Sequence, residues 1–313
     1  MPVAGHPSQE PVFAKAIVSL TNDFTIEVTP KEVQKDGERL AELLPSGARV
    51  YITFLANSPF GDTVAAVARL ASLRLRPVPH LAARSVADER ALDQMVGQLG
   101  QAGATELLVI AGSVGRPAGT ITESMQVLGS GLLSRHGIER VGVAGHPEGS
   151  KDIGDARLAE ALAQKNRFAR ESGLDMYLLT QFCFAADPIV QWEARIRAAG
   201  NRLPVHVGLA GLTSPIKLLK FGLACGVGPS LKVLRKQAGG VLKLAAGSVY
   251  YPDHVLMGLA EAVQRDPASL LRSVHFFPFG AADPTVDWVQ QLRAGRFHVD
   301  AEAGRVSVAG RPA

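Results

Sequence analysis

The chain has 313 residues, of which 47% are hydrophobic and 20% are charged, so it is long enough to bury a substantial core. No apolar run approaches the roughly 18 to 20 residues that span a bilayer, which argues against a membrane protein. The net charge of +4 is spread along the chain without a block of Lys or Arg, which argues against a nucleic-acid partner.

The first residues, "MPVAGHPSQEPVFAK", lack the basic and apolar regions of a secretory signal, so we expect a cytoplasmic protein. Cys183 and Cys225 lie in apolar segments without a metal-binding or redox spacing, and we expect them to be buried thiols. The composition fits a protein that binds small molecules and has no nucleic-acid or membrane partner. It leaves a homo-oligomer possible.

Short β-branched or aromatic runs alternate with longer amphipathic stretches, which is the pattern of βα units around a parallel sheet. The amphipathic stretches include "VADERALDQMVGQLGQAG" (86–103) and "DARLAEALAQKNRFARESG" (155–173), each closed by a glycine typical of a helix end. We predict eight strands, at residues 24–30, 49–56, 76–83, 106–113, 140–148, 176–184, 204–211 and 273–280.

Eight βα repeats in a chain of this length predict an α/β fold of the (β/α)8 TIM-barrel type, as a single domain over residues 1–313. The interval 212–272 predicts extra helices before the last strand. We expect a short N-terminal tail at 1–15 and a hairpin-like C-terminal tail at 295–313. A doubly wound dinucleotide-binding sheet is disfavoured, because no Gly-rich fingerprint follows the first predicted strand.

The active site of such a barrel forms at the C-terminal ends of its strands. Residues with chemical potential fall in or just after the predicted strands: Glu27, Thr53, His80, Ser113, His146, Glu148, Gln181 and His275. Thr53 and His80 could equally be polar core groups that bond to backbone. Glu27 is flanked by apolar residues, so burial is expected to raise its pKa toward that of a general acid. A structural ion pair with Arg or Lys is the alternative.

Gly145 and Gly149 bracket His146 and Glu148 directly after a predicted strand, where a backbone can approach a ligand closely; an ordinary tight turn explains the same pattern. No metal-ligand spacing is present, and we expect no metal site. Gln181 interrupts an apolar strand, and its amide could bond either to a heterocycle such as a pterin or to neighbouring backbone.

These segments together resemble the methylenetetrahydrofolate reductase family, flavoproteins built on a (β/α)8 barrel. The resemblance covers roughly residues 20 to 290 in the family's order. It is carried most specifically by "VAGHPEG" and by "TQFCF" after the next predicted helix, with support from "FTIEVTP", "PHLAA" and "GLAGLTSPIKLLKFGLACGVGPS".

The resemblance implies FAD as cofactor, NADH or NADPH as electron donor, and a folate as substrate. It implies that Glu27 is the acid that protonates a folate nitrogen and that Gln181 contacts the pterin. Thr53 and His80 match residues that lie against the flavin. Lys165 or Arg167 would take the place of the lysine that holds the flavin pyrophosphate.

Several positions depart from the family. Ala111, Gly112 and Ser113 stand where an Arg-Gly-Asp tripeptide lies beside flavin and folate, and His146 replaces a tyrosine at the flavin edge. Ser150 replaces a histidine, and "GAADP" replaces an Asn-Arg pair after the last strand.

We therefore expect a flavin-dependent enzyme that interconverts 5,10-methylenetetrahydrofolate and 5-methyltetrahydrofolate. The alternatives are a flavin-independent hydride transfer, a pterin barrel that transfers a methyl group to a corrinoid protein, and a non-catalytic folate or flavin binder.

Overall fold

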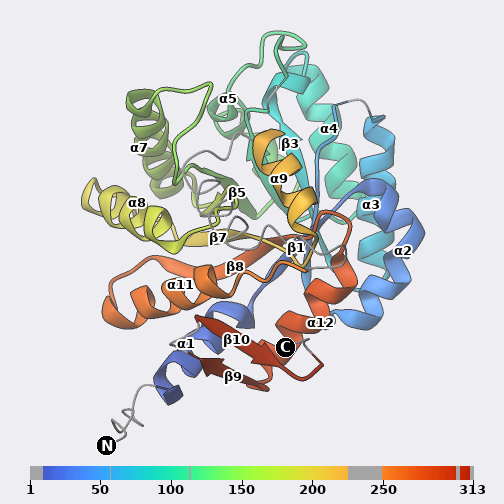
Figure 1. Ribbon diagram of the computed structural model, residues 1–313. Coiled ribbons are helices and arrows are strands. Elements are labelled where there is room, and N and C mark those ends of the chain that lie inside the picture. Colours follow the sequence, from blue (N-terminus) through green and yellow to red (C-terminus); the bar gives the residue numbers. More distant parts are fainter. Residues whose placement is uncertain (1–9, 57, 113, 225–248, 301–303, 311–313) are drawn as a thin grey trace, which may run out of the picture.

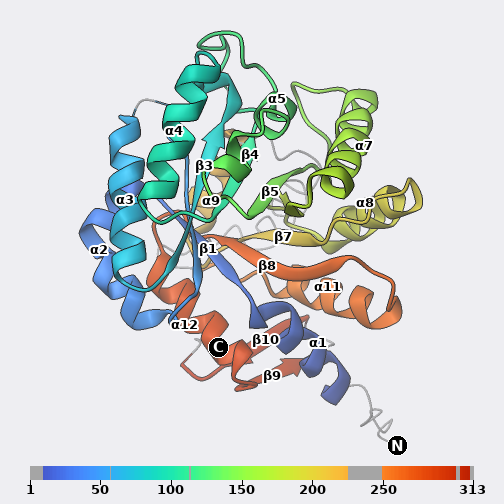
Figure 2. The ribbon, with the colours of Figure 1, turned by 180° about the vertical axis from the view of Figure 1, so that it is seen from behind.

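The computed structural model describes residues 10–56, 58–112, 114–224, 249–300 and 304–310. Eight parallel strands close into a barrel in the order of the sequence, with helices around it (Figure 1 and Figure 2). This confirms the predicted (β/α)8 fold. The strands are β1 (Thr25–Val28), β2 (Arg49–Ile52), β3 (Arg76–Ala82), β4 (Glu106–Ile110), β5 (Arg140–Gly145), β6 (Asp175–Thr180), β7 (Val205–Ala210) and β8 (Leu271–Phe277).

All eight predicted strands are present, but several end earlier than expected. The strand predicted to run to residue 56 ends at Ile52, although Thr53 N still donates to Val28 O at 2.9 Å. Phe54 and Leu55 extend the apolar pattern of the sequence past that point, but they belong to the loop that leaves the barrel.

The helices that surround the barrel include two between β7 and β8, which confirms the extra helices predicted there. Their bounds are α2 (Pro30–Leu43), α3 (Phe60–Ser72), α4 (Glu89–Gln101), α5 (Ser124–Leu128), α6 (Leu132–Arg135), α7 (Asp155–Ser172), α8 (Ala186–Ala198), α9 (Pro215–Ala224), α11 (Asp253–Arg265) and α12 (Ala282–Arg293), with a 3-10 turn at Ala83–Ser85.

Local capping explains why β1 stops soon after Glu27. Thr29 is the N-cap of α2, and its hydroxyl accepts from the Glu32 backbone N–H at 3.2 Å. The Glu32 carboxylate accepts in return from the Thr29 backbone N–H at 2.6 Å. This capping box, followed by Pro30 at the first helical position, turns the chain away two residues after Glu27.

The predicted N-terminal tail at 1–15 is wrong for residues 10–15, because the helix α1 begins at Glu10 and runs to Asn22. This helix packs against β8, α11 and α12, so its apolar residues have a partner that only the closed barrel provides. At the other end of the chain, β9 (Phe297–Asp300) and β10 (Arg305–Val308) form the expected antiparallel hairpin beside α1 (Figure 1).

Alternate residues of each strand face two separate cores. Ile26 and Val50 belong to the large core between the strands and the helices, whereas Tyr51 and Tyr177 belong to a smaller cluster inside the barrel with Val78, Leu108 and Leu179. The two tyrosine hydroxyls hydrogen-bond to each other from opposite strands, β2 and β6. They therefore form a bridge across the interior of the barrel.

Charged residues fill the interior at the N-terminal ends of the strands. Arg49 begins β2 and Arg140 begins β5, and both guanidinium groups face the carboxylate of Glu106 at 3.8 and 3.9 Å. Glu106 is nearly buried, and the Arg140 guanidinium also lies 4.8 Å from the Tyr177 ring centroid. The lower interior is thus ionic, whereas aliphatic residues dominate most barrels of this type.

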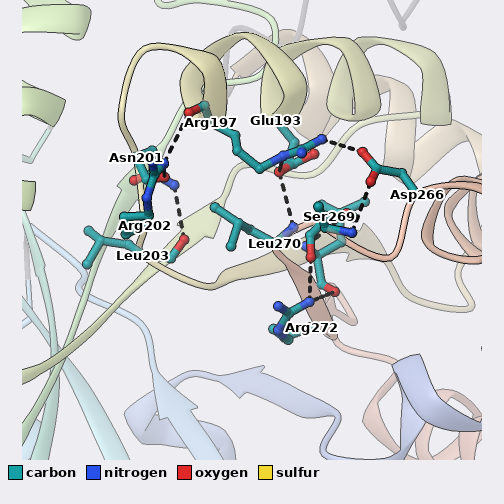
Figure 3. Close-up of polar contacts among 11 residues, drawn as sticks. Glu193, Arg197, Asn201, Arg202, Leu203, Asp266, Ser269, Leu270 and Arg272 are labelled. Atoms are coloured by element: carbon teal, nitrogen blue, oxygen red, sulfur yellow. Dashed lines mark hydrogen bonds and ion pairs between the residues drawn. The ribbon is translucent and has the colours of Figure 1, made fainter.

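A second polar network ties α8 to the start of β8 (Figure 3). The buried carboxylate of Glu193 accepts from Arg197 Nε at 2.8 Å and from the Leu270 backbone N–H at 3.1 Å. Arg197 also bonds to Asp266, at the end of α11. A hollow of about 570 Å³ lies beside this network, lined in part by Arg197 and Asn201. Because these groups bond to one another, we assign the network a structural role.

We expect Glu193→Ala to destabilise the protein by about 2 to 3 kcal/mol, because the change strands a buried backbone N–H and removes a partner of Arg197. Denaturant unfolding measures this effect. Glu261→Ala is the matched control, since Glu261 pairs with Arg265 at the same i,i+4 spacing but both side chains are more than half exposed. That change is expected to cost less than about 1 kcal/mol. Equal losses in the two variants would contradict the assignment.

Candidate functional site at the barrel mouth

Four neighbouring strands bring polar side chains to one side of the barrel mouth. Glu27 comes from β1, Thr53 follows β2, His80 comes from β3 and His275 from β8. The pairing of β1 with β8 sets Thr25 opposite His275, so residues 250 positions apart in the sequence become neighbours. Glu27, Thr53 and His80, which the sequence pattern predicts at the ends of strands, therefore lie together on this side of the mouth.

The carboxylate of Glu27 lies between two imidazoles. Its Oε2 is 3.3 Å from His80 Nε2 and 3.7 Å from His275 Nε2. The Glu27 side chain is 15% exposed, His80 is 8% exposed and His275 is completely buried. Thr53 also faces the carboxyl through its hydroxyl. The partners of Glu27 in the described chain are therefore histidines, and the alternative of an ion pair with Arg or Lys is not observed there.

These three atoms do not satisfy one another fully. Glu27 Oε2, His80 Nε2 and His275 Nε2 are buried, and none makes a hydrogen bond of good geometry within the described residues. Buried polar atoms in native proteins nearly always have such a partner. Their convergence at the mouth is the feature expected where a polar ligand completes the site.

The pKa of Glu27 is lowered, so the expectation that burial would raise it is wrong. Burial is the largest single influence and does raise the pKa, but the charge of His80, the neighbouring His275 Nε2 and the Thr53 hydroxyl together outweigh it. Burial in turn lowers the pKa of His80 and of His275. At neutral pH the site thus holds an ionised carboxylate, and the imidazoles take up a proton only at lower pH, where their charge acts on Glu27.

A buried cation lies at the end of β5. Lys165, on α7, is 7% exposed, and burial lowers its pKa to about 8. Burial, and then the charge of Lys165, lowers the pKa of His146 to about 4. No acidic side chain in the described part of the chain forms an ion pair with Lys165. The other sequence candidate, Arg167, is exposed on the same helix.

The end of β4 is shaped for close approach. Ala111 O accepts from the Arg84 backbone N–H at 2.9 Å, which fixes the chain as it leaves the strand. Gly112 has a φ of +86°, and a Cβ there would lie 3.1 Å from the Cβ of Ala82. Glycine is therefore needed at this position. Ser113 lies outside the described residues.

Gln181 immediately follows β6, and its side-chain oxygen accepts from the Phe182 backbone N–H at 3.1 Å. This contact matches the simpler of the two readings of Gln181, an amide bonded to nearby backbone. No hydrogen bond joins Gln181 to Glu27 among the residues described. Cys183 is buried as expected, and burial followed by the charge of Glu148 raises its pKa; Cys225 lies outside the described residues.

Sequence reasoning missed the aromatic contacts around these polar groups. The Tyr51 ring lies 4.5 Å from that of His275, edge to face, and the Phe277 ring lies 4.6 Å from the same imidazole, also edge to face. Beyond Phe277, the rings of Phe279 and Phe221 stack at 4.5 Å. The alternation of large aromatic residues along "SVHFFPF" was the available signal, but it does not say which rings face the barrel.

No protein-family model matches the sequence. Similar folds include a Burkholderia cenocepacia J2315 protein named as a phosphonomutase, with 12% identity over 90% of this chain and 99% of that one, at a TM-score of 0.50. Dihydrodipicolinate synthase from Agrobacterium tumefaciens C58 is also similar, with 12% identity over 93% of this chain and 80% of that one, at a TM-score of 0.50. At such identities the likeness supports the barrel fold alone.

Among the described residues, no helix has the length and apolar character that crossing a membrane requires. No group of three or more His, Cys, Asp or Glu side chains in the same part of the chain could hold a metal ion.

We expect Lys165→Met to stabilise the ligand-free protein at pH 7 by about 2 to 3 kcal/mol, because it removes a buried charge without a counter-ion. The folded pKa of about 8 lies below the ordinary lysine value of 10.5, so the cost of the lysine is fully present below pH 8 and fades as the pH rises toward 10.5. Denaturant unfolding at pH 7 and at pH 9.5 measures both effects.

Arg167→Met is the control, since it removes an exposed charge two residues away and is expected to change stability by less than about 0.5 kcal/mol. If Lys165→Met instead destabilises the protein at pH 7, Lys165 supports the fold through its contacts and is not held ready for an anion.

Proposed function

We propose that this barrel is a flavin-dependent oxidoreductase that interconverts 5,10-methylenetetrahydrofolate and 5-methyltetrahydrofolate. The observation that carries the proposal is the Glu27 carboxylate at the mouth, which faces buried nitrogen atoms of His80 and His275 that lack full partners. A proton-transfer residue of this kind matches the acid of the methylenetetrahydrofolate reductase family, which the sequence segments resemble.

The residues at the mouth fit FAD in two respects. Lys165 is a nearly buried cation without a carboxylate partner in the described chain, which suits the negatively charged pyrophosphate. Gly112, next to Ala111, turns the chain at the end of β4, where the resemblance places a tripeptide beside the flavin. His80 and Thr53 lie beside Glu27, so a flavin against them would also lie against the acid. His146, close to Lys165, would stand at the edge of the cofactor.

Bound FAD, reduced by NADH or NADPH, would supply hydride to the one-carbon unit. The part of this chain is to open the methylene bridge of the folate, which requires a proton on the nitrogen that leaves. Glu27 is ionised in the resting site, so it must first take up a proton. A ligand that covers its remaining 15% exposure strengthens burial, the influence that raises its pKa.

Gln181 is the proposed pterin contact. Its side-chain oxygen already accepts from the Phe182 backbone N–H, so the amide nitrogen is the group that would donate to a pterin carbonyl. The absence of the family aspartate at position 113 removes one charge from beside the cofactor. We expect this change to alter the reduction potential of the flavin and the preferred direction of the reaction.

We expect the purified protein to bind FAD, to lose its yellow absorbance on addition of NADH or NADPH, and to recover it when methylenetetrahydrofolate is added. Glu27→Gln should lower turnover about 10²- to 10⁴-fold while leaving FAD affinity nearly unchanged. Absorbance and stopped-flow measurements test both statements.

The alternatives give different outcomes in the same assays. Methyl transfer to cobalamin without a nicotinamide indicates the methyl-transferring barrel. Hydride transfer from NADH or NADPH by colourless protein that FAD cannot reconstitute indicates a flavin-independent reductase. Tight folate or flavin binding without turnover in the wild-type protein indicates a binding protein.

A further inference from the structure

His275 is the one imidazole of the mouth that is fixed by a hydrogen bond among the described residues. Its Nδ1 lies 2.8 Å from the hydroxyl oxygen of Thr25, on the neighbouring strand β1. His275 is 0% exposed and Thr25 is 1% exposed. Neither side chain can exchange this contact for water. The hydrogen-bond donors and acceptors of both side chains therefore need partners in the protein or its ligand.

The count of donors decides the tautomer of His275. Thr25 has one hydroxyl proton, and its side chain has no other hydrogen-bond partner in the described part of the chain. If Nδ1 carried the proton, the buried Thr25 hydroxyl would accept and its own proton would have no acceptor. If the hydroxyl donates to Nδ1, every donor of the pair has a role. The proton of the neutral imidazole then lies on Nε2.

The rest of the site holds this nitrogen toward Glu27. His275 Nε2 is 3.7 Å from Glu27 Oε2, a distance that a small side-chain movement converts into a hydrogen bond. Tyr51 and Phe277 contact the imidazole edge to face at 4.5 and 4.6 Å, which restricts rotation of the ring.

His80 differs in both respects. Its Nε2 lies closer to Glu27, at 3.3 Å, but no hydrogen bond within the described residues fixes its ring. It lies on β3, separated from β1 by β2, and 8% of its side chain is exposed, whereas His275 is completely buried. His80 is thus placed to meet a ligand, whereas His275 is placed behind the acid.

We propose that His275, with its tautomer set by Thr25, is a positioning residue that presents an Nε2–H donor to the Glu27 carboxylate. This donor aligns the carboxylate and favours its ionised form until a ligand covers it. The assignment of a catalytic purpose to this arrangement rests on the proposed function, but the arrangement itself exists in the ligand-free protein.

The test is a titration of Glu27 in ligand-free protein by infrared difference spectroscopy, with Glu27→Gln used to identify the carboxyl band. Thr25→Val removes the hydroxyl, and Thr25→Ser restores it. His275→Asn keeps a group near the position of Nδ1 but none that reaches Glu27, whereas His275→Gln places an amide N–H near the position of Nε2. Circular dichroism confirms that each variant is folded.

Thr25→Val and His275→Asn should raise the apparent pKa of Glu27 by about 1 to 2, the effect of losing a hydrogen bond to a charged group. Thr25→Ser and His275→Gln should titrate like the wild type. The other titratable or polar groups that face Glu27 and His275 are unchanged in all four variants: His80, Thr53, Arg49, Tyr51 and His206. Identical titrations in the valine and serine variants would overturn the proposal.

The titration needs no cofactor or substrate, so it separates this inference from the proposed function. If the wild-type protein reduces no folate but the Glu27 titration moves as stated, the function is wrong and the positioning role stands. If the wild type is active, the alkaline limb of its pH profile, where the proton donor Glu27 loses its proton, should move to higher pH with Thr25→Val and return with Thr25→Ser. If the enzyme is active and Thr25→Val leaves its pH profile unchanged, the positioning role is contradicted and the proposed function is not.

Discussion

The pairing of β1 with β8 is the contact on which the mouth depends. It closes the barrel, and its register sets Thr25 opposite His275. A carboxylate in this setting loses water and would favour its neutral form, yet the imidazoles of His80 and His275 reverse that preference. The resting site therefore holds an ionised carboxylate that closure of the sheet helps to stabilise through His275, and any ligand that covers Glu27 changes the balance between burial and these polar contacts.

Periodicity in the sequence was enough to predict the barrel, because each strand is a short apolar run and each is followed by an amphipathic helix. Strand ends were harder to predict. Phe54 and Leu55 extend the apolar pattern of β2 although they belong to the mouth loop. The helix α1 was missed because "EPVFAKAIVSLTN" is stabilised by β8, α11 and α12, partners at the opposite end of the chain.

The candidate site was predictable as a set of residue types, but its electrostatics were not. Glu27, Thr53 and His80 lie on successive βα units, so their proximity follows from the fold class. The lowered pKa of Glu27 depends first on His80 and then on His275, which is far away in the sequence and becomes a neighbour only by closure of the sheet. Burial also distinguishes Lys165 from Arg167, two residues that the sequence pattern alone could not separate.

The hydroxyl bridge between Tyr51 and Tyr177 divides the inside of the barrel into a lower part, at the N-terminal ends of the strands, and an upper part, at the mouth. Below the bridge, the charges of Arg49, Glu106 and Arg140 balance one another. Above it lie the Glu27 carboxylate, which is 15% exposed, and the buried imidazoles of His80 and His275. The bridge does not insulate the two parts, because burial and also the charge of Arg49 lower the pKa of His275. A substitution of Arg49 is therefore expected to change both the ion pairs at the base of the barrel and the titration of the histidine above them.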